Sequence, residues 1–122
     1  MPLALASGSS PEILAKVTSS LDIGHYFKAN VSAEEVGKSK PHPDLFSETA
    51  KRLGVDSLHC VVIEDSQYGV EAAKRAFMRC IAIPSIIEEP LDDAFYTADV
   101  LFKKGMREFN YKKTYKWIKQ RR

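Results

Sequence analysis

Residues 60–66 read Cys-Val-Val-Ile-Glu-Asp-Ser, and this stretch decides the fold. Its first four residues are apolar and mostly β-branched, which predicts a strand buried on both faces. The apolar run ends abruptly in two carboxylates and a serine. A helical pattern follows through Val70, Ala73 and Phe77, and a second apolar run covers Cys80 to Ile83. The stretch therefore predicts a strand–helix–strand unit.

The same alternation extends over the rest of the chain. Ser10, with Pro11 behind it, is suited to cap and begin a helix after the first apolar run. Strands that alternate with helices imply an α/β fold, with a mostly parallel sheet flanked by helices on both faces. The other expected elements are strands within Leu3–Ala6, Tyr26–Val31 and Val100–Phe102, a helix carrying Ile13, Leu14, Val17 and Leu21, a helix carrying Phe46, Ala50 and Leu53 before Gly54, and a helix carrying Tyr111, Tyr115 and Ile118 after Asn110.

Length and composition favour one globular domain. The chain has 122 residues, of which 44% are hydrophobic and 28% charged, so a core is possible without disulfides or metals. No apolar run approaches the roughly 20 residues of a membrane-spanning helix, and residues 1–6 lack the features of a signal peptide. We therefore expect a cytoplasmic protein with no membrane partner, in which Cys60 and Cys80 are reduced core residues.

The net charge of +2 hides a strong asymmetry. Residues 103–122 contain nine Lys or Arg and one Glu, whereas residues 1–102 are acidic. Interleaved basic and aromatic residues such as Tyr111 and Trp117 suit a nucleic-acid backbone with stacked bases. Tyr111, Tyr115 and Ile118, however, have the spacing of a packed helix face, and the body is acidic. We therefore favour a solvated helix face and expect no nucleic-acid partner.

The first of three polar clusters is Ser7-Gly8-Ser9-Ser10, between an expected strand and an expected helix. A hydroxyl, a glycine that lets the backbone approach closely, and the free N–H groups of a helix start together suit a phosphate. A turn that only caps the helix is the alternative.

The second cluster is Lys38-Ser39-Lys40-Pro41-His42-Pro43-Asp44. The two prolines stiffen the backbone and fix where Lys40 points, and a lysine can neutralise a phosphate. A solvated loop lysine is the alternative. We interpret His42 as a turn residue and not as a metal ligand.

The third cluster, Glu64-Asp65, follows the buried strand directly. Mg²⁺ favours carboxylate oxygens, water and substrate phosphate, so this pair is a candidate magnesium site. Capping of the next helix by Asp65 or Ser66 is the alternative. Gly69 is expected to let that helix pack close to the sheet.

Together and in this order, the clusters resemble the motifs of the haloacid dehalogenase-like hydrolase superfamily, in particular its β-phosphoglucomutase-like and sugar-phosphatase branch. Residues 3–9 are similar to the second motif, whose Ser or Thr binds the transferred phosphoryl group. Residues 39–44 are similar to the third, whose lysine steadies the nucleophile and the phosphate. Residues 62–72 are similar to the fourth, whose acids hold Mg²⁺. Residues 98–99 and 105–106 resemble the end of the family's core.

This resemblance implies roles for particular residues. Ser7 and Lys40 would be catalytic, and Glu64 and Asp65 would be the metal ligands. The phosphate ligands would be Ser7, Gly8, Ser9 and Lys40. The cofactor would be Mg²⁺, and the substrate a small phosphorylated metabolite.

One motif of the family is not found in the chain. The family's chemistry begins with two aspartates separated by one residue, and none of the seven aspartates here starts such a pattern. The resemblance therefore implies a Rossmann-like core that lacks its first, central strand. We expect residues 1–122 to be a truncated, partial core domain without the nucleophile and without a cap domain.

The implied function is phosphatase or phosphoglucomutase-type transfer on a small phosphate monoester such as a sugar phosphate, through an aspartyl-phosphate. We expect this chain alone to be inactive and its Mg²⁺ binding to be weak or absent. The alternative is a non-catalytic binding protein derived from the same core. Because unpaired strand edges are costly, we expect the place of the missing strand to be closed by direct pairing of its neighbours, by a homodimer or second chain, or by a bound segment.

Overall fold

Helices and strands alternate along the computed structural model, which describes residues 1–120. Arg121 and Arg122 of the basic tail lie outside the described residues. The elements are β1 (Ala4–Ser7), α1 (Pro11–Ser20), β2 (Ala29–Ser32), α2 (Asp44–Leu53), β3 (Val61–Glu64), α3 (Gln67–Arg75), β4 (Arg79–Ala82), β5 (Val100–Leu101) and α4 (Tyr111–Gln120). This order confirms the predicted α/β class. None of the helices in the described part is long and apolar enough to cross a membrane.

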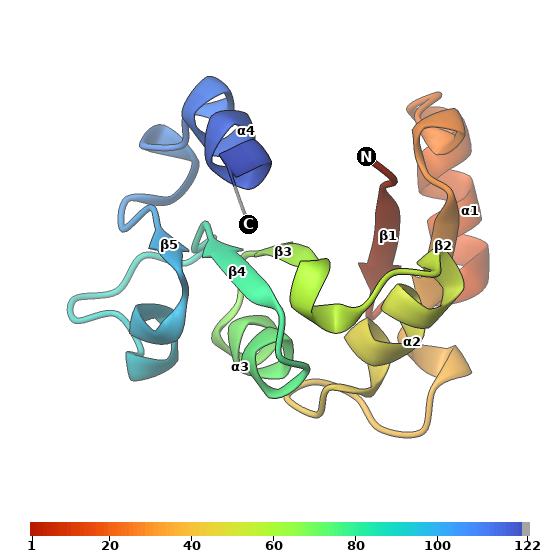
Figure 1. Ribbon diagram of the computed structural model, residues 1–122, viewed down its shortest axis with the longest axis horizontal. Coiled ribbons are helices and arrows are strands. Elements are labelled where there is room, and N and C mark those ends of the chain that lie inside the picture. Colours follow the sequence, from red (N-terminus) through yellow and green to blue (C-terminus); the bar gives the residue numbers. More distant parts are fainter. Residues whose placement is uncertain (121–122) are drawn as a thin grey trace.

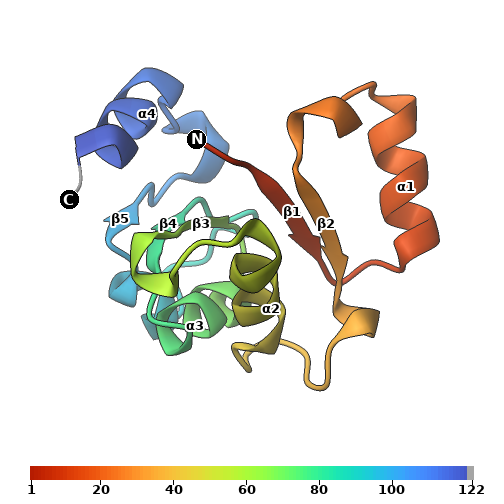
Figure 2. The ribbon, with the colours of Figure 1, turned by 45° about the vertical axis from the view of Figure 1, so that its right-hand side comes forward.

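The strands form two parallel sheets that lie side by side (Figure 1). β1 pairs with β2, placing Ala6 opposite Val31. β4 lies between β3 and β5, with Val62 opposite Cys80. Helix α2 contacts both strands of the smaller sheet and also packs on α3, so it joins the two halves (Figure 2). Within residues 1–120, β1 and β3 are not hydrogen-bonded to each other. Direct pairing of these two strands, one of the three expected ways of closing the place of the missing strand, is therefore not found; α2 packs on both halves instead.

The helix ends follow from local chemistry. The Ser10 hydroxyl accepts a hydrogen bond from the N–H of Ile13, at 3.3 Å, and caps α1. Gly54 adopts the left-handed conformation, with φ of 70°, and ends α2. The Ser66 hydroxyl caps α3, and the Asn110 side chain accepts a hydrogen bond from the N–H of Lys113. The sequence predicts Ser10, Gly54 and Asn110 at these helix ends. For the start of α3 it leaves Asp65 and Ser66 as alternatives, and Ser66 is the cap.

The core lies where α3 packs against β3, β4 and the turn at residues 93–97, and it is extended by side chains of α2. Its members are mostly small or medium apolar side chains, which lets the helices approach the sheet closely. Cys80 is buried here and Cys60 is half-buried at the edge, both as free thiols. The buried cluster comprises Phe46, Ala50, Val62, Val70, Ala72, Ala73, Ala76, Met78, Cys80, Ala82, Leu91 and Phe95.

Several predicted apolar faces are exposed instead. β3 was expected to be buried on both faces, but 54% of the Ile63 side chain is accessible, because nothing in the described chain covers that face. Phe77 ends α3 with a positive φ of 63° and points into solvent. On α1 only Leu14 of the predicted apolar face is buried, and Ile13, Val17 and Leu21 are exposed.

The exposed tyrosines of the basic tail correct the expectation that their spacing marks a packed helix face. Tyr111 and Tyr115 have the spacing of a packed face, yet both are exposed on α4, while Trp117 and Ile118 are half-buried. The guanidinium of Arg79 lies over the Trp117 ring, 4.8 Å from its centroid, which attaches α4 to β4.

Candidate phosphate site

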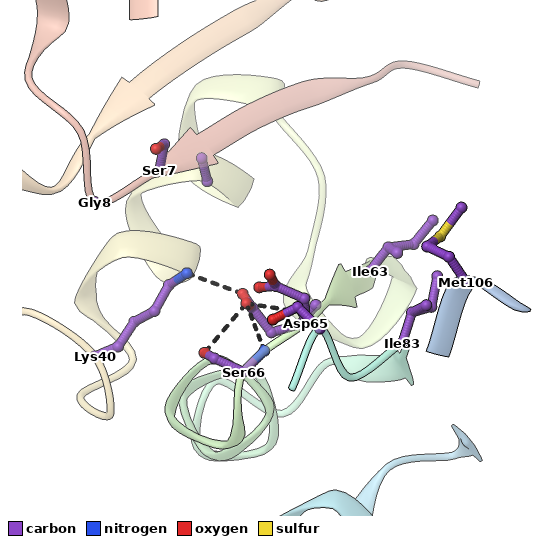
Figure 3. A pocket seen from close by; sticks show the side chains of 11 residues that line it. Ser7, Gly8, Lys40, Ile63, Asp65, Ser66, Ile83 and Met106 are labelled. Carbon is purple, nitrogen blue, oxygen red and sulfur yellow. Dashed lines mark hydrogen bonds and ion pairs between the residues drawn. The ribbon is translucent and has the colours of Figure 1, made fainter. Parts of the chain in front are cut away.

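A single pocket collects residues from all three predicted clusters (Figure 3). It has a volume of about 590 Å³ and lies between the carboxyl ends of β1 and β3. Ligands of open parallel sheets bind at this edge. Ser7, Gly8, Lys40, Glu64 and Asp65 all line it, and Ser9 is not among its lining residues. The lining is completed by Ala6, Ile63, Ser66, Ile83, Ser85 and Met106.

The β1 side of the pocket is a loop held by its own hydrogen bonds. The N–H of Ser9 donates to the Ser7 hydroxyl oxygen at 3.1 Å. The Ser9 carbonyl accepts a hydrogen bond of 2.6 Å from the Ser32 hydroxyl at the end of β2. Gly8 has open space around it, with no atom within 4 Å of the position of a β-carbon. Ser9 therefore shapes the loop, and Ser7 and Gly8 face the pocket.

Lys40 reaches the pocket from the loop before α2. Its ammonium group lies 2.9 Å from a carboxylate oxygen of Glu64, and 5.2 Å from the centroid of the Phe46 ring. The two contacts direct the side chain inward, which agrees with the role expected of the rigid loop. The N–H of His42 donates to the Ser39 carbonyl within this loop, as expected of a turn residue.

The Glu64 carboxylate is buried and fully engaged. One oxygen accepts hydrogen bonds from the N–H of Asp65 at 3.1 Å and the N–H of Ser66 at 3.3 Å. The Ser66 hydroxyl lies 3.4 Å from the same oxygen, and the other oxygen pairs with Lys40. Only 8% of the Glu64 side chain is exposed. In this arrangement both oxygens are already satisfied.

Asp65 differs from its neighbour. It is exposed, lines the pocket, and its carboxylate has no hydrogen-bond or ion-pair partner within residues 1–120. Its backbone carbonyl accepts a hydrogen bond of 3.2 Å from Ser85 after β4. Ser66, and not Asp65, caps α3.

A magnesium ion would find few ligands here. Among residues 1–120 there is no group of three or more His, Cys, Asp or Glu side chains placed to hold a metal ion. Mg²⁺ needs one or two carboxylates, with water and phosphate oxygens in its other positions. Asp65 alone supplies such a carboxylate, so the residues present fit a weakly held ion.

Six lining residues are not among the site residues that the sequence predicts: Ala6, Ile63, Ser66, Ile83, Ser85 and Met106. The sequence predicts Ser66 as a candidate helix cap and Ile63 as a core position, both within the stretch that resembles the fourth motif. Ile83 and Ser85 follow β4, and their place could have been predicted because neighbouring parallel strands end at one edge. Met106 arrives from the turn before α4. The sequence indicates this position only through the resemblance of residues 105–106 to the end of the family's core.

Comparison with known proteins assigns the family. A family model described as a haloacid dehalogenase-like hydrolase matches residues 1–76. The chain belongs to the haloacid dehalogenase-like hydrolase family. This assignment confirms the resemblance inferred from the three motifs. The second, third and fourth motifs, at residues 3–9, 39–44 and 62–72, all lie inside the matched residues.

The relatives of this haloacid dehalogenase-like chain include sugar phosphatases and phosphoglucomutases. Hexitol phosphatase B of Escherichia coli (strain K12) is 45% identical over 96 residues, which cover 79% of this chain and 43% of that protein. The crystal structure of CbbY from Rhodobacter sphaeroides in complex with phosphate is 28% identical, with a TM-score of 0.75 over 84% of this chain and 46% of that chain. β-Phosphoglucomutase from Clostridium difficile, 22% identical, shares the fold with a TM-score of 0.78, over 98% of this chain and 50% of that chain. The chain thus spans half the length of these relatives or less.

Proposed function

We propose that this chain is the phosphate-binding part of a phosphotransfer enzyme that acts on a small phosphate monoester, such as a sugar or hexitol phosphate. The observation that carries the proposal is the convergence of Ser7, Lys40 and Asp65 on one pocket, although they lie far apart in the sequence. The relatives support the same class, since one is a hexitol phosphatase and another was crystallised with phosphate. On this proposal residues 1–122 form part of the core domain, without a cap.

Each residue has a distinct task in this proposal. The Ser7 hydroxyl and the backbone around Gly8 and Ser9 hold phosphoryl oxygens at the end of β1. Lys40 neutralises part of their charge. Asp65 would hold Mg²⁺, which supplies charge neutralisation at the phosphoryl group when bound, while Glu64 stays paired with Lys40.

Transfer itself needs a nucleophile that these residues do not supply. No Asp-x-Asp pattern occurs in the sequence, and among residues 1–120 the Ser7 hydroxyl is hydrogen-bonded to the N–H of Ser9 and not to a basic side chain. We expect no turnover of sugar phosphates by the 122-residue chain in the presence of Mg²⁺. Robust Mg²⁺-dependent hydrolysis by a chain of verified mass would contradict this expectation.

Phosphate binding tests the proposal directly. In an NMR titration with inorganic phosphate, the amides of Ser7, Gly8 and Asp65 should shift together. Lys40→Met should weaken the affinity roughly tenfold or more, because a hydrogen bond to a charged group contributes about 1.5–3 kcal/mol. Lys38→Met is the matched control, since Lys38 is exposed in the same loop and does not line the pocket. Equal affinities for Lys40→Met and Lys38→Met would reject the proposal.

A non-catalytic interaction protein is the second candidate function. It is favoured by one observation: within the described residues 1–120, β1 and β3 each pair with another strand on one side only, and Ile63 of β3 is exposed. Unpaired edges attract further strands. The occupant that fits is an extended apolar segment of a second polypeptide, or of a second copy of this chain, lying between β1 and β3.

Sedimentation at several protein concentrations tests this candidate. Association that Ile63→Lys weakens would support it, because a buried lysine is costly at a strand interface. Ile86→Lys serves as the control, since Ile86 is also exposed but lies outside both strands. A monomer at every concentration would argue against it.

A further inference from the structure

We propose that Glu64 is a positioning residue for Lys40, and that Gly69 is required because the Glu64 carboxylate occupies the space of its β-carbon. The inference deepens the proposed function and rests on it, since Lys40 matters only if the pocket binds phosphate. Its point is that the acid beside Asp65 acts through a lysine instead of a metal.

The carboxylate of Glu64 is fixed at the start of α3. It accepts backbone hydrogen bonds from Asp65 and Ser66, at 3.1 and 3.3 Å, and a helix N-terminus favours a negative charge. Its second oxygen, 2.9 Å from the Lys40 ammonium, is therefore a fixed point for a long and flexible side chain. Lys40 is itself only 23% exposed, and within the described residues Glu64 is its single ion-pair partner.

Gly69 provides the place for this carboxylate. It lies one turn into α3, where a β-carbon would collide with Cγ, Cδ and Oε2 of Glu64. All three atoms belong to the end of a flexible side chain, so the helix can accept an alanine if Glu64 moves to another rotamer. A methyl group at residue 69 therefore displaces the carboxylate while leaving both charges in the protein.

The contact between Gly69 and Glu64 allows the position of the Glu64 carboxylate to be changed without changing its charge. Removing Glu64 by mutation would also delete a negative charge near the phosphate. The loss of this charge would by itself strengthen the binding of an anion. Gly69→Ala keeps that charge and changes only where the carboxylate lies. Lys40 then loses its fixed partner and regains the rotamers that it has in a free side chain.

The experiment is a double-mutant cycle of Gly69→Ala with Glu64→Ala. Two readouts are taken on the 122-residue chain: the NMR signal of the Lys40 ammonium group and the dissociation constant for inorganic phosphate. We expect Gly69→Ala to abolish the distinct Lys40 signal and to weaken phosphate binding by roughly tenfold. In the Glu64→Ala background the same substitution should change neither readout, since nothing is left to displace. Gly37→Ala is the matched control, because a β-carbon there meets only Asp44 at an ordinary 3.5 Å.

Each outcome decides a different claim. If Gly69→Ala leaves the Lys40 signal and the phosphate affinity unchanged, the inference is wrong. If it has the same effect with and without the Glu64 side chain, its cause is helix packing, and the inference is also wrong. If the native chain binds no phosphate, the proposed function fails, and the Lys40 signal still reports whether Glu64 holds the lysine.

Discussion

Glu64 and Asp65 are neighbours in the chain, yet their carboxylates have opposite environments. Glu64 is buried and its two oxygens are engaged by Lys40 and by backbone N–H groups. Asp65 is exposed at the pocket and without a partner in the described part of the chain. The sequence predicted that both would lie at the end of a strand. It could not predict which carboxylate would pair with Lys40, because that depends on the tertiary position of the lysine and on the space beside Gly69.

The two cysteines are expected to react at very different rates. Burial raises the pKa of the Cys80 thiol to about 12, and the nearby charge of Glu64 adds to the effect. The thiolate is the reactive form, so Cys80 should resist alkylation in the native protein. Cys60 is half-buried and should be labelled first. Mass spectrometry of peptides labelled over time with iodoacetamide measures the alkylation rates of both cysteines. In urea, where the chain is unfolded, the two rates should be equal, which provides the control. Equal rates in the native state would contradict the burial of Cys80.

Asp99 should make stability depend on pH in the acidic range. Partial burial acts to raise its pKa, but hydrogen bonds from Lys74 at 2.8 Å and the N–H of Cys80 at 2.7 Å outweigh this and hold the pKa below its ordinary value. The native state therefore binds the proton less readily than the unfolded state. The resulting stabilisation is present above the unfolded pKa and is lost as pH falls through the folded pKa.

Asp99→Asn tests this dependence by urea unfolding at a series of acidic pH values. The variant should be less stable near neutral pH and should lose less stability on acidification than the native chain. Asp93→Asn, at an exposed residue without an ion pair among residues 1–120, should keep the native pH profile. If Asp99→Asn keeps the pH profile of the native chain, the Asp99 carboxylate does not contribute to the pH dependence of stability.

At the scale of elements, the chain's own pattern predicted which segments form helices and strands, and where several of them end. Ser10 and Gly54 mark ends by chemistry that acts within one turn, so they can be read locally. Burial could not be read in the same way. Ile63 and Val17 have apolar side chains on regular elements, but whether they are covered depends on what packs against those faces. The residues that line the pocket from β4 and the turn at Met106 likewise depend on tertiary contacts.

The edge of β3 offers a prediction at this scale. The carbonyls of Cys60 and Glu64 accept hydrogen bonds from the N–H groups of Arg79 and Ile83. The backbone N–H and C=O groups of the even-numbered residues of this strand therefore point toward β4. In a parallel ladder the intervening residues point their N–H groups to the other side. The amides of Val61 and Ile63 should therefore exchange with deuterium much faster than that of Val62, as NMR would show.

Equal protection of all three amides would mean that another strand covers this edge in solution. Such a result would favour the interaction partner of the second candidate function. The amides of Ile81 and Ala82, in the strand between two others, provide the protected reference.

The whole molecule consists of two parallel sheets joined by α2, with the candidate phosphate site where their strand ends meet. The fold class, the family and the three clusters could be predicted because motifs at strand ends converge in this class of fold. The separation of the sheets could not, since it depends on how α2 packs on both. The central claim is that Ser7, at the end of β1, and Lys40, in the loop before α2, bind one anion together.

A crystal structure of the 122-residue chain grown with tungstate, a heavy analogue of phosphate, tests that claim most directly. The account predicts one tungstate in the pocket, within hydrogen-bond distance of the Ser7 hydroxyl and the Lys40 ammonium group, with Lys40 still paired to Glu64. Tungstate bound only at exposed basic residues such as those of α4, with the pocket empty, would contradict it.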